Sequence, residues 1–156
     1  MHLRFERFGW RFYVALTRSY RMGGVNSRAL VGDDILHFLM WDFDDVPQAE
    51  VIAALSLVQD WYGLGEIRVV HTGFSNYHAY CFDPHSWADT VAILTNTPWV
   101  DQAYLKIGYI RGYYTLRITP KKGREMKLIA VLGQRLPWEI DPTTVGSFSE
   151  YLTSKG

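Results

Sequence analysis

The feature that most constrains the fold of this chain is a short apolar run, residues 35–41, which passes directly into Asp42-Phe43-Asp44-Asp45. An almost continuously apolar run of this length is typical of a strand that is buried on both faces of a sheet. The sequence therefore predicts a central strand with a group of carboxylates at its C-terminal end.

The residues after this strand predict a helix, two strands and a second helix. Residues 47–62 repeat apolar side chains at helical spacing. Residues 66–71 and 77–82 are predicted to be the two strands of a hairpin, joined by the short polar loop between them. Asp83 and Pro84 then suit the N-cap and the first position of the second helix.

Weaker signals flank these elements on both sides. They predict an N-terminal hairpin of residues 10–20 and 25–31 that turns at Gly23-Gly24, strands at residues 113–119 and 125–132, and a terminal helix at residues 147–154. From residue 35 the order strand, helix, strand, strand, helix, strand is the split βαββαβ arrangement. The predicted fold class is therefore α+β, with an RRM-like βαββαβ sheet and an N-terminal β-hairpin flank.

Length and composition favour one domain. The chain has 156 residues, of which 48% are hydrophobic and 15% aromatic, so we expect a single domain over residues 1–156 with its motifs at about residues 35–124. No run approaches the roughly 20 apolar residues that cross a bilayer, which favours a cytoplasmic protein that does not enter a membrane. The single cysteine, Cys81, excludes an internal disulfide and a multi-thiolate zinc site, so no zinc is expected.

Charge is unevenly distributed along the chain, although the formal net charge is zero. Residues 1–28 hold six arginines against one acid, and residues 102–124 hold six basic residues and no acid. An acidic stretch lies between them: Asp33, Asp34, Asp42, Asp44, Asp45 and Glu50. This pattern suits a site that holds divalent cations and phosphates together, and ordinary solvated charge is the alternative.

Asp42 and Asp44 are the first candidate site residues. Residues i and i+2 of an extended segment point to one side, so both carboxylates can reach the same hard cation. Two carboxylates at the end of an apolar strand are costly unless a metal or an arginine compensates them. The alternative is structural, because acids followed by a proline often mark a change from strand to helix, with Asp45 as an N-cap.

The loop between the two hairpin strands is the second candidate. Backbone N–H groups near Gly73, a hydroxyl from Thr72 or Ser75, and the imidazole of His78 would supply contacts to a triphosphate. The alternative for His78 is a half-buried strand residue with a local hydrogen bond.

The third candidate begins at Asp101, which could return a further carboxylate to the same edge of the sheet or lie in a surface turn. Downstream, basic residues alternate with aromatic ones, a mixture that suits phosphate contacts and base stacking, or a half-exposed strand. The residues in question are Arg111, Tyr113, Tyr114, Leu116, Arg117, Lys121 and Lys122.

The order of these three elements resembles the archaeo-eukaryotic primase superfamily, which includes primase-polymerases and the polymerase domains of bacterial end-joining ligases. The palm of that family carries an Asp-x-Asp/Glu motif after a strand, a serine-to-histidine motif in a hairpin, and a later hydrophobic residue and aspartate followed by basic residues. The corresponding residues here are Trp41-Asp42-Phe43-Asp44, residues 72–78, and Trp99-Val100-Asp101 with Thr115-Leu116-Arg117-Ile118 downstream.

The resemblance implies a template-directed DNA or RNA primase or primase-polymerase that uses two Mg²⁺ or Mn²⁺ ions. Asp42, Asp44 and Asp101 would be the catalytic metal ligands. A nucleoside triphosphate would be held by Thr72 or Ser75, His78, Arg117 and Lys121, and a single-stranded nucleic-acid template by Arg111, Tyr113 and Lys122. A helicase or an accessory subunit would be a further partner.

Other functions remain open from the sequence alone. A metal-dependent nuclease would use the same aspartates with water as the nucleophile. A non-catalytic module that binds single-stranded nucleic acid would present aromatic residues on the same sheet and would need no metal. A primase-like fold retained for protein assembly is the third possibility.

Overall fold

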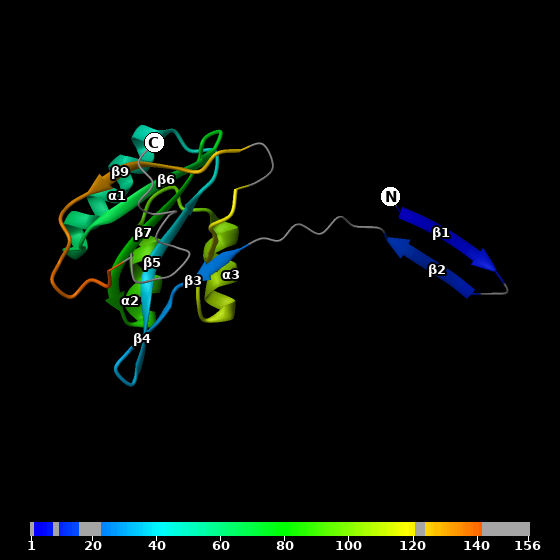
Figure 1. Cartoon of the computed structure of the whole chain (residues 1–156), viewed down its shortest axis with the longest axis horizontal. Coiled ribbons are helices and arrows are strands. Elements are labelled where there is room, and N and C mark those ends of the chain that lie inside the picture. The colour runs from blue at the N-terminus through cyan, green and yellow to red at the C-terminus, as the bar shows by residue number, and fades with distance from the viewer. Residues whose placement is uncertain (1, 8–9, 16–22, 121–123, 142–156) are drawn as a thin grey trace.

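The computed structural model describes residues 2–7, 10–15, 23–120 and 124–141. Figure 1 shows the arrangement of their helices and strands. In chain order these are β1 (His2–Arg7), β2 (Trp10–Ala15), β3 (Gly24–Asn26), β4 (Arg28–Val31), β5 (Asp34–Phe43), α1 (Gln48–Tyr62), β6 (Ile67–Gly73), β7 (Asn76–His85), α2 (Trp87–Asn96), α3 (Gln102–Arg111), β8 (Thr115–Arg117) and β9 (Lys127–Leu132).

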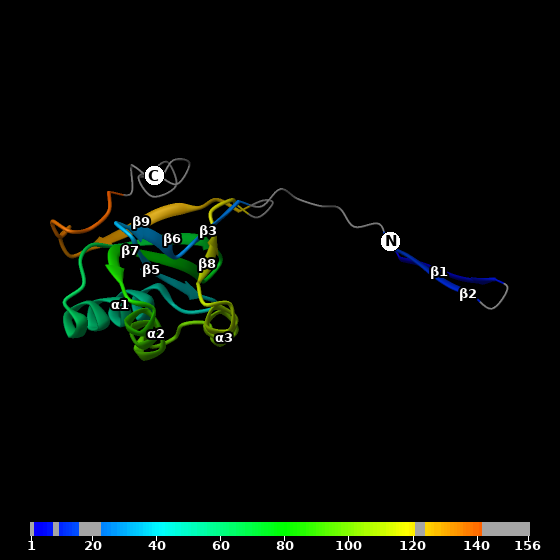
Figure 2. The same ribbon diagram turned by 90° about the horizontal axis from the view of Figure 1, so that it is seen from below.

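The centre of the fold is a five-stranded antiparallel sheet in the order β4-β5-β7-β6-β9. Helices α1, α2 and α3 lie on one side of this sheet (Figure 2). Two further sheets have two strands each, β1 with β2 and β3 with β8. The predicted α+β class is confirmed, and none of the helices in the described residues is long and apolar enough to cross a membrane.

The predicted central strand is β5, whose residues Leu39, Met40 and Trp41 are fully buried. Successive side chains of a strand point to opposite faces. Leu39 and Trp41 belong to the core cluster beneath the helices, whereas Met40 belongs to the cluster on the other face of the sheet. Strand β7 divides in the same way, because Ala79 is in the helix-side cluster and Tyr80 in the opposite one.

This alternation decides where the polar ends of the strands lie. Asp42 is two residues after Met40, and His78 is two residues before Tyr80, so each points to the same face as that neighbour. Both side chains therefore lie on the face of the sheet away from the helices. The two residues are also direct partners in the register of β5 and β7. Paired main chains therefore bring the predicted acidic and histidine motifs together.

The predicted N-terminal hairpin of residues 10–20 and 25–31 is wrong. Strand β2 pairs with β1, whereas residues 24–31 divide into β3, which pairs with β8, and β4, which pairs with β5. The division falls at Ser27, which is fully buried. Its N–H donates to Tyr114 O at 2.8 Å and its carbonyl accepts from Phe38 N at 2.7 Å, so one residue joins the two sheets.

The boundary between the hairpin and the second helix also differs from the prediction. Strand β7 continues through Asp83 and Pro84 to His85, three residues beyond the predicted end, and α2 begins at Trp87. Its N-cap is Ser86, whose Oγ accepts from Asp89 N at 3.1 Å. The motif of an acid followed by a proline resembles a helix start, but the pairing of His85 with His37 across β5 keeps the segment extended.

Helix α3 was not predicted, and it changes the position of the next strand. Its residues lack a regular apolar stripe, since only Leu105 and Gly108 are buried. The helix lies along β5 beyond the end of β4, where the carbonyls of Met40 and Asp42 accept from Tyr104 Oη at 2.9 Å and Asp101 N at 2.9 Å.

The strand predicted at residues 113–119 is shortened to β8, which pairs with β3 and not with the central sheet. The strand predicted at 125–132 is β9, at the edge beside β6. The predicted terminal helix at 147–154 lies outside the described residues.

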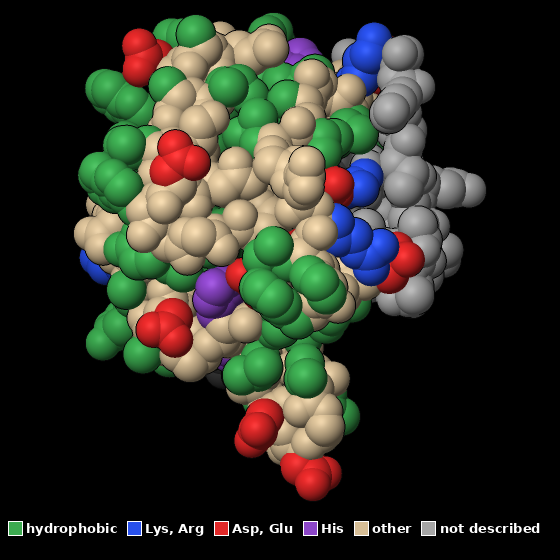
Figure 3. Space-filling view, turned by 90° about the vertical axis from the view of Figure 1, so that its left-hand side faces the viewer, with side chains coloured by type: hydrophobic (Ala, Val, Ile, Leu, Met, Phe, Trp, Pro, Cys, Tyr) green, Lys and Arg blue, Asp and Glu red, His purple; other side chains and the backbone are tan. Residues whose placement is uncertain are grey.

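The hairpin of β4 and β5 projects from the body of the protein, and its tip carries acidic and hydrophobic side chains together (Figure 3). Gly32 adopts φ 62° at the turn between the two strands. Leu30 and Ile35, which are register partners, are 75% and 64% exposed. This projection lies at the opposite end of β5 from the carboxylates of interest.

Candidate functional site

Two cavities adjoin at Asp42. The first, here called the polar cavity, has a volume of about 240 Å³ and is lined by Asp42, Asp44, Thr72, Asn76, His78, Thr115, Leu116, Arg117 and Arg124. The second, here called the α3 cavity, has a volume of about 290 Å³ and is lined by Asp42, Asp101, Ala103, Tyr104, Ile107, Gly108, Arg111, Tyr113 and Thr115. Asp42 and Thr115 line both cavities, so the two cavities are neighbours.

The floor of the polar cavity is the pair Asp42 and His78. The carboxylate Oδ1 lies 3.5 Å from His78 Nε2, and the side chains are 23% and 8% exposed. The other ring nitrogen, Nδ1, lies 3.3 Å from Tyr80 Oη. The imidazole is therefore held between a carboxylate and a phenol, so its orientation in the cavity is fixed.

Thr72 is the hydroxyl of the predicted loop that reaches the polar cavity. Its side chain is buried and lines the cavity beside His78, whereas Ser75 is exposed and does not line it. Ser75 has a structural contact instead, because its carbonyl accepts from Val46 N at 3.0 Å. Of the two hydroxyls between which the sequence leaves the choice open, Thr72 is therefore the one that lines the cavity.

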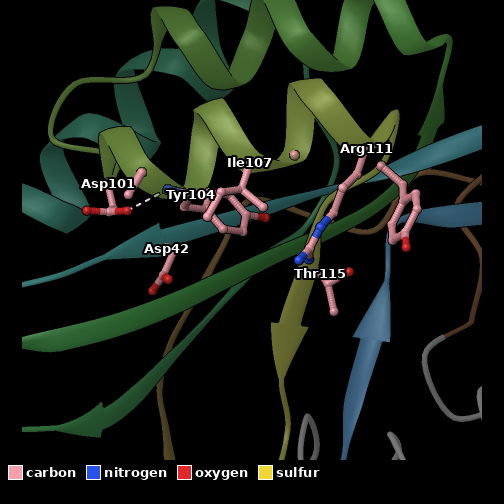
Figure 4. A pocket seen from close by; sticks show the side chains of 9 residues that line it. Asp42, Asp101, Tyr104, Ile107, Arg111 and Thr115 are labelled. Atoms are coloured by element: carbon pink, nitrogen blue, oxygen red, sulfur yellow. Dashed lines mark hydrogen bonds between the residues drawn. The ribbon is translucent and has the colours of Figure 1, made fainter. Parts of the chain in front are cut away.

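Asp101 does not lie in the polar cavity with Asp42 and Asp44. It is the N-cap of α3, where Oδ1 accepts from Tyr104 N at 2.6 Å (Figure 4). Its backbone N–H donates to Asp42 O, so the two aspartates are tied through the main chain while their carboxylates line the α3 cavity together. One oxygen of Asp101 is thus committed to capping the helix.

Tyr104 forms the inner wall of the α3 cavity. Burial raises the pKa of its phenol well above the usual value, and the charges of Asp42 and then Tyr114 add to the effect. The hydroxyl donates to Met40 O at 2.9 Å. Tyr104 therefore stays neutral at physiological pH and offers the cavity an aromatic surface.

The rim of the α3 cavity carries a cation and a further aromatic ring. Figure 4 shows Arg111 extending from the end of α3 toward Thr115. Tyr113 lies on the same rim, and the guanidinium carbon of Arg28 is 4.6 Å from the centre of its ring. Arg111 and Tyr113, both predicted to contact nucleic acid, are therefore at one cavity.

The donor set at Asp42 and Asp44 suits a hard divalent cation, because both carboxylates line the polar cavity and oxygen ligands are those that Mg²⁺ and Mn²⁺ prefer. No group of three His, Cys, Asp or Glu residues in the described part of the chain is close enough to form a complete metal site. The protein would therefore provide part of the ligand shell, as Mg²⁺ sites commonly do when substrate phosphates and water complete it.

Three residues of the polar cavity were given no role in the predicted site, although Asn76 and Thr115 stand within its motifs: Asn76, Thr115 and Arg124. Asn76 follows a turn, and its side-chain Oδ1 accepts from Asp45 N at 3.1 Å, a contact that residue type alone does not reveal. Thr115 belongs to β8, where it is the register partner of Asn26 in β3. Arg117 lines the cavity as predicted, and the predicted residues Lys121 and Lys122 lie outside the described residues.

Comparison of the chain with protein-family models, with characterised proteins and with solved structures finds no match. The class that the fold and site define is an α+β protein with two carboxylates, an imidazole and two guanidinium groups around one cavity, at the sheet face away from the helices. Functional inference therefore rests on this geometry.

Proposed function

We propose that this protein is a metal-dependent nucleotidyltransferase, a template-directed primase or primase-polymerase module. The observation that carries the proposal is the position of Asp42 in the wall between two cavities of different character. On one side, His78, Arg117 and Arg124 surround Asp42 and Asp44, and on the other side Tyr104 and Tyr113 line an aromatic space. An anion with an attached planar group matches this pair of cavities.

The order of strands supports the finer fold assignment, in which β5-α1-β6-β7-α2 is a palm of the primase type. Strand β7 lies between β5 and β6, and the helices lie on one side, which agrees with the first three strands of the split arrangement. In this palm the motif residues stand at the ends of β5, β6 and β7. The predicted final strand of this arrangement is β8, which pairs with β3 outside the central sheet, so β8 and α3 would lie beside the nucleotide.

Each residue has a role that follows from its place. Asp42 and Asp44 would hold the divalent ion, with Asp101 close by in the adjoining cavity. His78 and Arg117 would donate to the phosphate oxygens and keep them in line for attack, and Thr72 would add a hydroxyl donor. Mg²⁺ or Mn²⁺, when bound, would lower the pKa of the attacking 3′-hydroxyl and neutralise charge on the phosphates.

A second candidate is a non-catalytic module that binds single-stranded nucleic acid. The use of Asp101 as a helix cap favours it, because a capping carboxylate is explained without any metal. This candidate does not account for Asp42 and Asp44 beside each other at one cavity, where they would repel phosphate. A nuclease would use the same carboxylates with water in place of the 3′-hydroxyl, and differs in needing no nucleoside triphosphate.

The test is incorporation of labelled nucleotides on primed and unprimed single-stranded templates with Mg²⁺ or Mn²⁺. Asp42→Asn and Asp44→Asn should each abolish incorporation, whereas Asp60→Asn, an exposed aspartate on α1, should leave it unchanged. Binding of template without incorporation in the wild type would favour the non-catalytic module, and metal-dependent cleavage of the template would favour the nuclease.

A further inference from the structure

Phe74 lies at the tip of the hairpin between β6 and β7, in a position that does not favour folding. Its side chain is 76% exposed, and its backbone adopts φ 57°. A large apolar side chain gains little free energy from an exposed position, and a bulky residue at positive φ is strained. The residue therefore calls for an explanation in terms of what its ring contacts.

The ring of Phe74 contacts Arg124. The guanidinium carbon lies 4.4 Å from the ring centroid, within the range of a cation–π interaction. The stem of Arg124 passes over Gly73, where a Cβ would lie 2.7 Å from Arg124 Cδ, so the glycine leaves room for it. Arg124 is thus held from two sides by consecutive residues of the tip.

The tip itself is fixed to its surroundings. The carbonyl of Phe74 accepts from His71 Nε2 at 2.6 Å. Ser75 O and the Asn76 side chain accept from the main chain of the turn after β5. A ring on such a tip can define the position of a long, flexible cation.

Arg124 lines the polar cavity but not the α3 cavity. Neither Arg124 nor Arg117 takes part in an ion pair with any other residue of the described ranges. Two guanidinium groups at one cavity that have no carboxylate partner within the described part of the chain are suited to bind an anion.

We infer that Arg124 binds the terminal phosphate of a nucleoside triphosphate and that Phe74 is the positioning residue that holds it there. The inference rests on the proposed function, in which the planar group occupies the α3 cavity. Asp42 and Thr115 mark the boundary between the cavities, so the phosphate chain enters the polar cavity beside Asp42. Its far end then lies among residues that line the polar cavity alone, and Arg124 is one of these.

The experiment compares dissociation constants of a nucleoside triphosphate, the monophosphate and inorganic tripolyphosphate, measured by calorimetry with the full chain in Mg²⁺. Arg124→Gln should weaken triphosphate and tripolyphosphate binding at least tenfold and leave the monophosphate within about twofold, as expected for loss of a charge-assisted contact. Phe74→Leu should weaken triphosphate binding about threefold to fivefold, which is the value of an exposed cation–π contact. Phe74→Tyr keeps an aromatic ring and should bind the triphosphate as the wild type does.

The double variant separates positioning from a general effect on the fold. In the Arg124→Gln background, Phe74→Leu should have no further effect on triphosphate binding. Additive losses, or equal losses for monophosphate and triphosphate, would overturn the inference while leaving the proposed function intact. If the protein incorporates no nucleotide but binds tripolyphosphate through Arg124 and Phe74, the anion site is supported and the proposed polymerase function is not. If none of the three ligands binds, both the anion site and the proposed function are contradicted.

Discussion

Asp42 and His78 face each other across β5 and β7 as register partners, with Oδ1 and Nε2 3.5 Å apart. A carboxylate and an imidazole at this distance on paired strands are fixed by the sheet, so neither depends on a loop for its position. Tyr80 Oη, two residues along β7, lies near the second ring nitrogen.

Replacing His78 by glutamine should raise KM for the nucleotide about tenfold and reduce kcat less, because the ring serves to hold phosphates and not to react. Steady-state incorporation kinetics measure both. The matched control is His85→Gln, at the opposite end of β7, where the partner is Asp83 at 3.3 Å. An unchanged KM in His78→Gln would contradict the role of the imidazole in holding the phosphates.

Thr97→Val should lower the free energy of unfolding by about 1 to 3 kcal/mol, because it leaves a buried donor unsatisfied. Trp41, which is fully buried, donates from Nε1 to Thr97 Oγ1 at 2.9 Å. Urea denaturation followed by tryptophan fluorescence measures the change. Thr95→Val, two residues earlier in the last turn of α2, should cost much less, because that hydroxyl is exposed and donates to the carbonyls of Val91 and Ala92 in its own helix.

Gly108→Ala should destabilise the protein by about 1 to 3 kcal/mol through overpacking, although alanine normally favours a helix. A Cβ at Gly108 would lie 2.1 Å from a ring atom of Tyr114, so α3 would have to move away from the sheet. Gly108 also lines the α3 cavity, and we expect nucleotide affinity to fall with stability. The control is Gln102→Ala, at an exposed position of the same helix. Equal free energies of unfolding for the two variants would contradict the packing described for α3.

Glu139 should make stability depend on pH in the direction opposite to most carboxylates. Burial raises its pKa, and the nearby charges of Glu66 and Asp83 raise it further, although the backbone N–H of Leu136 donates to it and acts the other way. The folded protein then binds the proton more tightly than the unfolded chain, so the free energy of unfolding falls as pH rises from the unfolded pKa of about 4.3 through the higher folded value.

Thermal melts of the wild type and Glu139→Gln across this pH range measure the effect. Glutamine keeps an acceptor for Leu136 N, so the variant should show a weaker fall in Tm as pH rises. The control is Glu125→Gln, an exposed carboxylate that should retain the wild-type profile. A variant profile that is parallel to the wild type would contradict the role given to Glu139.

The three middle strands of the central sheet, β5, β7 and β6, could be predicted because they carry strong local signals. The apolar run of β5 and the hairpin of β6 and β7 were identified from pattern alone, and their register accounts for the meeting of Asp42, Thr72 and His78 at one cavity. The spacing of apolar residues did not predict α3. Only Leu105 and Gly108 of this helix are buried, so its sequence carries no regular apolar stripe.

The missed site residues have a related cause. Arg124 and Thr115 reach the polar cavity through contacts made far along the chain, with the tip at Phe74 and with β3. Such contacts depend on tertiary packing, and no local spacing in the sequence encodes them. The division of residues 24–31 at Ser27 was missed for the same reason, since its partners are Phe38 and Tyr114.

The turn after β5 and the tip of the β6–β7 hairpin are joined by two hydrogen bonds, from Asp45 N to Asn76 Oδ1 and from Val46 N to Ser75 O. An insertion or deletion in either loop would disturb both bonds and separate Asp44, which follows β5, from the arginine that the tip holds. Changes of length are instead compatible with the exposed β4–β5 turn at Gly32, far from the cavities. The two loops can therefore change in evolution only together, and grafting the site onto another sheet would require transferring both as one piece.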